Sequence, residues 1–249
     1  LEKWPTGGPP LSWKITGLGE GFSSLAVANG KIFTQGQRGG QHYVIALDEA
    51  TGRKLWEVAY GPSYSNRRGN GPRGTPTIDG DRLYAIGANG YIVCLNTQTG
   101  KTLWEIDFFK TLGARNISWG LSESPLVDGN RLIVNPGARG ASIVALDKMS
   151  GKMLWKSQSD EAGYSSAMPV ETGGVRQYVV LTGEAAVGLQ ASTGELLWRY
   201  DKVSNRTANI ATPIISGNHV FVSTDYGTGC ALLELSNSGG KVNAKEVYF

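Results

Sequence analysis

Two glycine-containing stretches of the chain look like loops that bind phosphate. The segment "NTQTGKTLWE", residues 96–105, contains the letters T-G-K-T with which a nucleotide-binding P-loop ends. The segment "GNGPRG", residues 69–74, satisfies the G-x-G-x-x-G pattern of dinucleotide-binding folds. In both cases backbone amides would have to converge on phosphate oxygens. The first question is therefore whether this chain holds a nucleotide.

Neither stretch fits that chemistry. A P-loop needs a glycine where this chain has Leu95, and Lys101 takes the place that other copies of the same stretch give to Arg53, Lys152 and Glu195. A lysine that binds phosphate would not be replaced by glutamate in a sister copy. The second stretch is followed by "TPTIDGDRLYAIG", which favours strands, whereas the pattern binds pyrophosphate only where a helix opens. We therefore predict that T-G-K-T is a hairpin turn and that residues 69–74 form a loop.

The T-G-K-T stretch belongs to a unit that occurs four times along the chain. The copies are "ALDEATGRKLWE" from Ala46, "CLNTQTGKTLWE" from Cys94, "ALDKMSGKMLWK" from Ala145 and "GLQASTGELLWR" from Gly188. Their tryptophans are spaced by 48, 51 and 43 residues, and a period of about 40 to 50 residues is typical of propeller blades. Each copy ends a group of four short, β-branched and aromatic segments, and a fifth group follows without the tryptophan.

These groups predict an all-β fold, a β-propeller of four-stranded antiparallel blades with almost no helix. We expect a single domain over residues 1–249, with blades at about 22–60, 75–108, 122–158, 165–201 and 210–249. The segment "PLSWKIT" predicts an N-terminal closing strand at 11–16, which is left over because the fifth group has its own fourth strand. The ring is thus expected to be incomplete, with closure as a five-bladed ring as the alternative.

The repeated tryptophans and glycines have a structural interpretation. A glycine four residues before each tryptophan suits the left-handed position of the turn between the third and fourth strands. The indole on the outermost strand would then bury a large surface between neighbouring blades. Four aromatic ligand platforms are the alternative. The expected blade-docking residues are Trp56, Trp104, Trp155, Trp198, Gly52, Gly100, Gly151 and Gly194.

The pattern A-L-D-x-x-[ST]-G-x-x-L-W resembles the tryptophan-docking repeat of pyrroloquinoline-quinone (PQQ) β-propellers. The chain resembles in particular the non-catalytic PQQ-like group that includes the outer-membrane assembly lipoprotein BamB, and the likeness spans residues 11 to 249. This resemblance implies about eight blades in the complete ring, a periplasmic or cell-envelope location, and a binding or interaction scaffold rather than an enzyme.

A quinone-dependent dehydrogenase is the first alternative function. In enzymes of this superfamily, adjacent cysteines form a disulfide ring under the quinone, and acidic and amide side chains bind calcium. This chain has only Cys94 and Cys230, in different repeats, and its one irregular aromatic and acid pair is Trp119 with Glu123. We therefore predict no catalytic residue, metal or cofactor. A propeller that binds a small ligand or a saccharide remains a further alternative.

Composition and charge exclude other classes of partner. The formal net charge is +3 over 249 residues, and lysines and arginines are scattered, which gives no basis for nucleic-acid binding. No apolar run is long enough for a transmembrane segment. The first residues, "LEKWPTGGPP", lack the basic and apolar regions of a signal peptide.

The longest connections predict the binding face. They include "GPSYSNRRGNGPRG", "FKTLGARNISWGLSE", "SDEAGYSS" and "KVSNRTANIA", on the face opposite the tight turns, and long loops on a rigid scaffold are where function concentrates. Seven of the twelve arginines lie on this loop-rich face, at 38, 67, 68, 73, 115, 139 and 206. Solvated surface charges, offset by nearby carboxylates, are the alternative interpretation.

Residues of these loops that lie close before innermost strands are expected to approach the central funnel. There they would contact a protein or a small polar or acidic ligand, because the planar guanidinium of arginine suits carboxylate and phosphate groups. The candidate binding residues are Arg73, Arg115, Trp119, Glu123, Tyr164, Arg206 and Asn209.

Overall fold

The computed structural model describes residues 3–249, which form five four-stranded sheets and one short helix. The first blade contains β1 (Ala26–Ala28), β2 (Lys31–Arg38), β3 (Gln41–Asp48) and β4 (Lys54–Pro62). The second contains β5 (Thr77–Asp79), β6 (Arg82–Ile86), β7 (Tyr91–Asn96) and β8 (Thr102–Asp107), followed by α1 (Phe108–Leu112). The third contains β9 (Leu126–Asp128), β10 (Arg131–Val134), β11 (Ile143–Asp147) and β12 (Met153–Ser157).

The last two blades repeat this arrangement. The fourth contains β13 (Met168–Thr172), β14 (Val175–Leu181), β15 (Ala186–Gln190) and β16 (Leu196–Tyr200). The fifth contains β17 (Ile214–Ser216), β18 (His219–Thr224), β19 (Gly229–Ser238) and β20 (Lys241–Tyr248). Within every sheet the strands follow in chain order and pair antiparallel. The predicted all-β propeller with four-stranded blades is confirmed.

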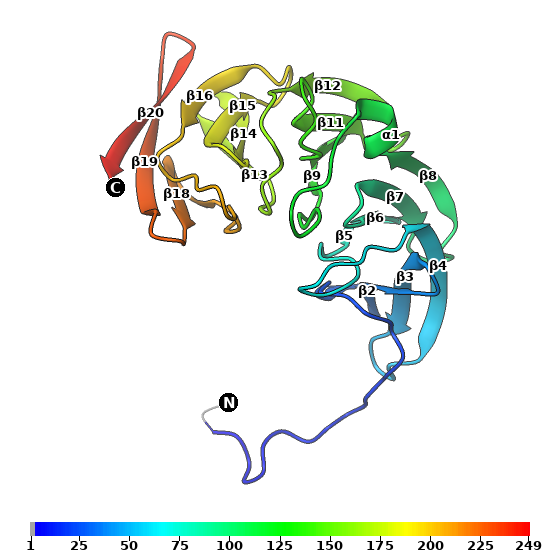
Figure 1. Cartoon of the computed structure of the whole chain (residues 1–249). Helices are drawn as coiled ribbons and strands as arrows, with labels where there is room; N and C mark the ends of the chain where they lie inside the picture. Colours follow the sequence, from blue (N-terminus) through cyan, green and yellow to red (C-terminus); the bar gives the residue numbers. More distant parts are fainter. Residues whose placement is uncertain (1–2) are drawn as a thin grey trace.

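The five blades follow one another around an open arc (Figure 1). The first strand of each blade lies on the concave side and the fourth strand lies on the outside, and the first and fifth blades are at the two ends of the arc. The described residues therefore do not close into a five-bladed ring, which was the alternative. The total of eight blades stays a prediction.

The middle strands of the second, third and fourth blades are buried on both faces because a neighbouring blade covers each side, whereas β18 and β19 of the fifth blade alternate between buried and partly exposed residues. In β7 the side chains of Ile92, Val93, Cys94 and Leu95 are fully buried, and such a continuous apolar run is expected of a strand enclosed on two sides. One core cluster joins Tyr84 of the second blade to Leu132 of the third. The hydrophobic core thus runs along the arc between the blades.

The T-G-K-T stretch is the turn that joins β7 to β8, as predicted. The backbone amide and the hydroxyl of Thr99 both donate to Oδ1 of Asn96, each at 3.0 Å. The first blade repeats this turn, with Thr51 donating to Oδ1 of Asp48 from its amide at 2.9 Å and its hydroxyl at 2.6 Å. The hydroxyl bond is the main cause that lowers the pKa of Asp48. A side chain that accepts from its own turn fixes this hairpin without a ligand.

Each of three indoles lies on the glycine turn of the following blade. The indole nitrogens of Trp56, Trp104 and Trp155 donate to the carbonyl oxygens of residues 97, 148 and 191 at 3.2, 3.1 and 3.0 Å. The same rings lie over the glycines at 100, 151 and 194, whose φ angles are between 73° and 75°. The turn of one blade therefore receives the tryptophan of the blade before it.

Trp198 makes a different contact. Its indole nitrogen donates to Oε1 of Gln177 in its own blade at 2.7 Å, and the ring covers Gly188, where a side chain would collide with it. The fifth blade joins β19 to β20 through residues 239–240 alone, so it has no counterpart of the turn that receives the other indoles. The ring still packs among buried side chains of the fifth blade, including Val220 and Leu233.

The predicted closing strand at 11–16 is not a strand in the structure. These residues have no strand assignment, because no neighbouring strand lies beside them to form a ladder. Trp13 instead lies against the first blade, where its indole nitrogen donates to the carbonyl oxygen of Glu49 at 3.0 Å and its ring covers Gly52. Trp13 therefore occupies, on the first blade, the position that Trp56 occupies on the second.

Hydroxyl side chains link the segments that lead into the innermost strands of the second to fifth blades. The backbone amide of Thr75 donates to the hydroxyl of Ser124 at 3.0 Å, and the amide of Ser124 donates to the hydroxyl of Ser166 at 2.9 Å. The amide of Ser166 donates in turn to the hydroxyl of Thr212 at 3.2 Å. These bonds fix the chain at the points where the long connections enter the blades.

The contact between glycine and indole predicts a difference between two glycines of the third blade. Gly151 and Gly129 both have a left-handed φ, at 73° and 59°, but a side chain at Gly151 would meet Trp104 at 2.9 Å, whereas Gly129 faces open space. We expect Gly129→Ala to lower the free energy of unfolding by about 1–2 kcal/mol from backbone strain alone. Gly151→Ala should lose about 1–3 kcal/mol more, because the ring must move. Urea unfolding of both variants measures the difference, and equal losses would show that the indole contact contributes nothing.

Candidate functional site

The connections that precede the innermost strands converge on the concave side of the arc (Figure 1). Three predicted residues, Arg73, Trp119 and Tyr164, lie together there and line a cleft of about 360 Å³. We call it the aromatic cleft, and its lining is completed by Phe22, Arg68, Ser122 and Ile210. Segments that enter all five blades thus contribute to one cleft.

Arg73 supports the cleft from within its own loop. Its guanidinium donates to the carbonyl oxygens of Gly69 and Gly71 and lies over the rings of Tyr64 and Phe22, with 4.7 and 5.4 Å to the ring centroids. Burial lowers the pKa of Arg73. Because two carbonyls and two rings occupy this side chain, it holds the loop and Phe22 in place rather than offering free donors to a ligand.

Aromatic and apolar groups make up the exposed part of the cleft. The rings of Trp119 and Tyr164 are tilted against each other with centroids 5.7 Å apart, and the guanidinium of Arg68 lies 5.8 Å from the centroid of Trp119. Burial raises the pKa of the Tyr164 hydroxyl. Phe22 and Ile210 are 61% and 56% exposed. The cleft therefore presents apolar surface beside a positive charge.

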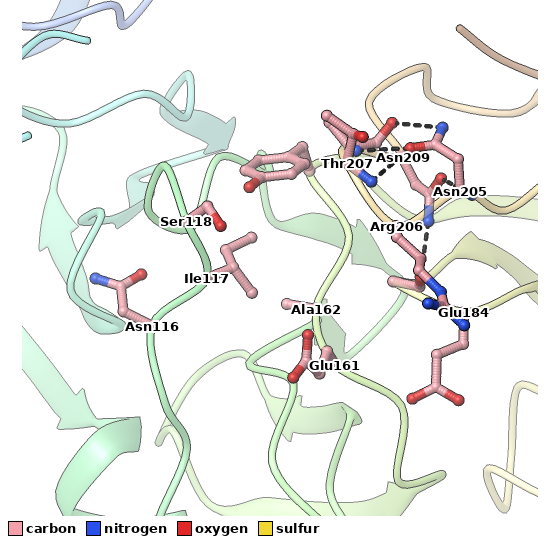
Figure 2. A pocket seen from close by; sticks show the side chains of 13 residues that line it. Asn116, Ile117, Ser118, Glu161, Ala162, Glu184, Asn205, Arg206, Thr207 and Asn209 are labelled. Carbon is pink, nitrogen blue, oxygen red and sulfur yellow. Dashed lines mark hydrogen bonds between the residues drawn. The ribbon is translucent and has the colours of Figure 1, made fainter. Parts of the chain in front are cut away.

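Arg206 and Asn209 lie in an adjoining pocket of about 420 Å³, which shares Tyr164 with the aromatic cleft. Figure 2 shows this side pocket with Asn116, Ile117 and Ser118 on one wall and the 205–209 loop on the other. Asn209 is 2% exposed, and its side-chain amide donates to the carbonyl oxygens of Thr182 and Gly183. Asn209 therefore anchors the loop, whereas the exposed Arg206 is available to a ligand.

Arg115 lies in a third place, the outer hollow. This hollow measures about 330 Å³ and is lined by Arg115, Arg139, Ser159 and Glu161 together with neighbouring small and apolar residues. It shares Asn116, Ile117, Glu161 and Ala162 with the side pocket. The predicted residues are thus spread along a row of hollows rather than gathered at one point.

Glu123 points into the protein and lines none of these hollows. It is 2% exposed, its Oε1 accepts from the backbone amide of Asn135 at 2.6 Å, and its Oε2 is buried without a hydrogen-bond partner. Burial raises the pKa of this carboxyl to about 8. Glu123 therefore belongs to the interior of the third blade, unlike Trp119, which precedes it in the same connection.

The sequence patterns do not single out Phe22, Arg68 and Ile210 as binding residues. Phe22 falls at the expected start of the first blade, and Arg68 is one of seven arginines in the long connections. A comparison of "GFSS" at 21–24 with "GYSS" at 163–166 carries a signal for Phe22, because the second copy contains Tyr164. Both residues lie shortly before an innermost strand and reach the same cleft.

The residues present do not fit a quinone and calcium site. Cys94 is buried in β7 and Cys230 lies in β19, both as free thiols. Trp119 faces the cleft while the carboxyl of Glu123 is enclosed and bonded to Asn135. Within residues 3–249, no cluster of three or more His, Cys, Asp or Glu side chains is arranged to hold a metal ion.

The fold and the loops on its concave side define a β-propeller of the PQQ-like type. A family model described as "Outer membrane protein assembly factor BamB" matches residues 40–247, and the chain belongs to this family. A comparison with curated proteins finds no matching sequence.

Solved structures share the propeller fold at low sequence identity. A europium-containing methanol dehydrogenase superimposes with a TM-score of 0.60 at 15% identity, over 91% of this chain and 61% of that protein. The quinohemoprotein alcohol dehydrogenase from Comamonas testosteroni gives 0.56 at 16% identity, over 87% and 44%. The C-terminal WD40 domain of Sif2 gives 0.58 at 14% identity, over 85% and 54%. The chain thus spans less than two thirds of the length of each of these proteins.

The described part of the chain has no helix with the length and apolar character needed to cross a membrane. Its one helix, α1, has five residues.

The buried carboxyl of Glu123 predicts a pH-dependent stability. Its pKa is about 8 in the folded protein against an ordinary value of 4.5, so folding favours the protonated form. Stability from this group is complete below about pH 4.5 and is lost as the pH rises to about 8, at about 1.4 kcal/mol for each pKa unit. We expect Glu123→Gln to remove this loss. In urea unfolding, the free energy of unfolding of the variant should therefore rise relative to that of the wild type as the pH increases from about 4.5 to about 8. Glu49→Gln, at an exposed turn, is the control, and an unchanged difference at all pH values would contradict the assignment.

Proposed function

We propose that this chain is a non-catalytic scaffold that binds an acidic protein partner at its loop-rich face. The observation that carries the proposal is the contrast between its arginines. Within the described residues, four arginines lie within 4 Å of a carboxylate: Arg82, Arg176 and Arg199, and Arg38 of the loop-rich face, which pairs with Glu57. Five other arginines of this face, at 67, 68, 115, 139 and 206, have no carboxylate of residues 3–249 within 4 Å.

The acidic residues of the same face do not neutralise these arginines. Asp160 and Glu184 both lie against Arg199, at 2.8 and 3.7 Å. Glu20 accepts from the side-chain amide of Asn70 at 2.9 Å, and Glu123 is buried with a raised pKa. The alternative interpretation was that nearby carboxylates offset the charges of these arginines. Most of those carboxylates are instead buried or bonded to other side chains. A face with unpaired arginines beside an apolar cleft is complementary to an acidic surface with a protruding apolar group.

The cell envelope is the proposed place of this binding. Family membership supports it, since the family description names outer membrane protein assembly. The quinone-dependent dehydrogenase has no observation in its favour beyond the shared fold, because low-identity neighbours of this fold include both dehydrogenases and a WD40 domain.

A capture experiment with three matched baits tests the proposal. The wild-type chain, the double variant Arg68→Ala with Arg206→Ala, and the control Arg53→Ala are immobilised and exposed to a cell-envelope extract. Arg53 is an exposed arginine in the turn between β3 and β4, outside the loop-rich face. We expect a protein that the wild type and the control retain, that the double variant retains roughly tenfold less, and that added salt releases.

Three results would contradict the proposal. Equal capture by all three baits would remove the loop-rich face as the binding surface. A bound chromophore and dye reduction with alcohols, after reconstitution with quinone and calcium, would establish the enzyme. A thermal shift with neutral sugars that is lost in Trp119→Ala would instead favour the saccharide-binding propeller.

A further inference from the structure

The hollows of the loop-rich face adjoin one another through shared lining residues. The aromatic cleft and the side pocket share Tyr164, and the side pocket and the outer hollow share residues 116, 117, 161 and 162. Gly113 and residues 115–119 line the three hollows in chain order, from Gly113 and Arg115 at the outer hollow to Trp119 at the aromatic cleft. We call the three hollows together the loop groove. Its shape suits an extended ligand better than a compact one.

Positive charge lies toward both ends of the loop groove. Arg68 lies at the aromatic cleft, while Arg206 lines the side pocket and Arg115 and Arg139 line the outer hollow. All four are exposed, and none has a carboxylate within 4 Å among the described residues. The acidic residues that line the groove are Glu161 and Glu184. Glu184 is shared with Arg199, which leaves the groove with an excess of guanidinium groups.

Apolar surface lies in the aromatic cleft beside Arg68. Phe22 and Ile210 are more than half exposed there, beside the tilted pair of Trp119 and Tyr164. A free phosphate or a small carboxylate would leave this surface uncovered, and a neutral sugar would leave the guanidinium groups unpaired. An aromatic side chain of a ligand would bury apolar area here and stack against the rings. The loop groove is thus complementary to a ligand that has an apolar group with acidic groups on both sides.

From these positions we propose that the loop groove binds an extended peptide segment in which acidic residues flank one aromatic residue. The aromatic side chain enters the aromatic cleft, one acidic flank meets Arg68, and the other flank passes the side pocket to reach Arg115 and Arg139. This inference rests on the proposed function and specifies the part of the partner that is recognised.

Synthetic peptides test the inference directly. The probe has glutamates on both sides of a central phenylalanine, and its binding is followed by fluorescence anisotropy of an attached dye. Three comparison peptides replace the phenylalanine by alanine, move it to one end, or replace the glutamates by lysines. We expect each change to weaken binding by roughly tenfold or more, and the lysine peptide to give no binding.

Variants of the chain locate the two flanks. Arg115→Ala with Arg139→Ala should weaken binding of the full probe roughly tenfold, yet leave unchanged a shorter peptide that lacks the glutamates on the outer side. Trp119→Ala should remove most of the difference between the phenylalanine and alanine peptides. Arg53→Ala serves again as the control with full affinity.

The outcomes separate this inference from the proposed function. Equal binding of the acidic and lysine peptides, or of the central and terminal phenylalanine peptides, overturns the inference. So does an unchanged affinity of the Arg115 and Arg139 double variant for the full probe. If the envelope capture succeeds in the Arg68 and Arg206 comparison while no peptide binds, the scaffold stands and the extended acidic peptide is wrong. If capture and peptide binding both fail, both proposals are wrong.

Discussion

The contact between the indole of one blade and the glycine turn of the next determines how the blades follow one another. It joins a large apolar ring, whose burial removes about 150–250 Å² from water, to a hydrogen bond from the indole nitrogen to a turn carbonyl. Trp56, Trp104 and Trp155 repeat it, and Trp13 makes it on the first blade. Each contact involves only neighbours, so the first four blades form a one-dimensional repeat, while the fifth blade packs on the fourth without this contact.

The fold was predictable from the sequence because residues close together in the chain define each repeat. Turn residues, glycines and tryptophans recur in fixed order, and the side-chain bonds of Thr51 and Thr99 show that each turn is defined within a few residues. The exceptions depend on partners distant in the chain. Trp198 turns to Gln177 because the fifth blade lacks a receiving turn, and residues 11–16 form no strand because no strand lies beside them.

The candidate site was predictable only in part, because its chemistry depends on tertiary contacts. Arg73 and Arg206 look alike in the sequence, but Arg73 is held by carbonyls of its own loop and by two rings, whereas Arg206 is exposed. Glu123 lies four residues after Trp119, yet one is enclosed and the other faces the cleft. Which side of a loop faces solvent follows from packing against other blades, and no local pattern encodes it.

The distribution of ion pairs leaves the loop-rich face with unpaired arginine side chains. Arg199 lies on β16 and is paired with Asp160, while Arg206, in the connection that follows the same strand, has no such partner among the described residues. Exposed ion pairs contribute only about 0–1 kcal/mol to stability. Leaving the loop arginines unpaired therefore costs the fold little. Their guanidinium groups remain hydrated and free to meet carboxylates, and because the indole contacts hold the blades in place, these charges are presented at defined positions along the groove.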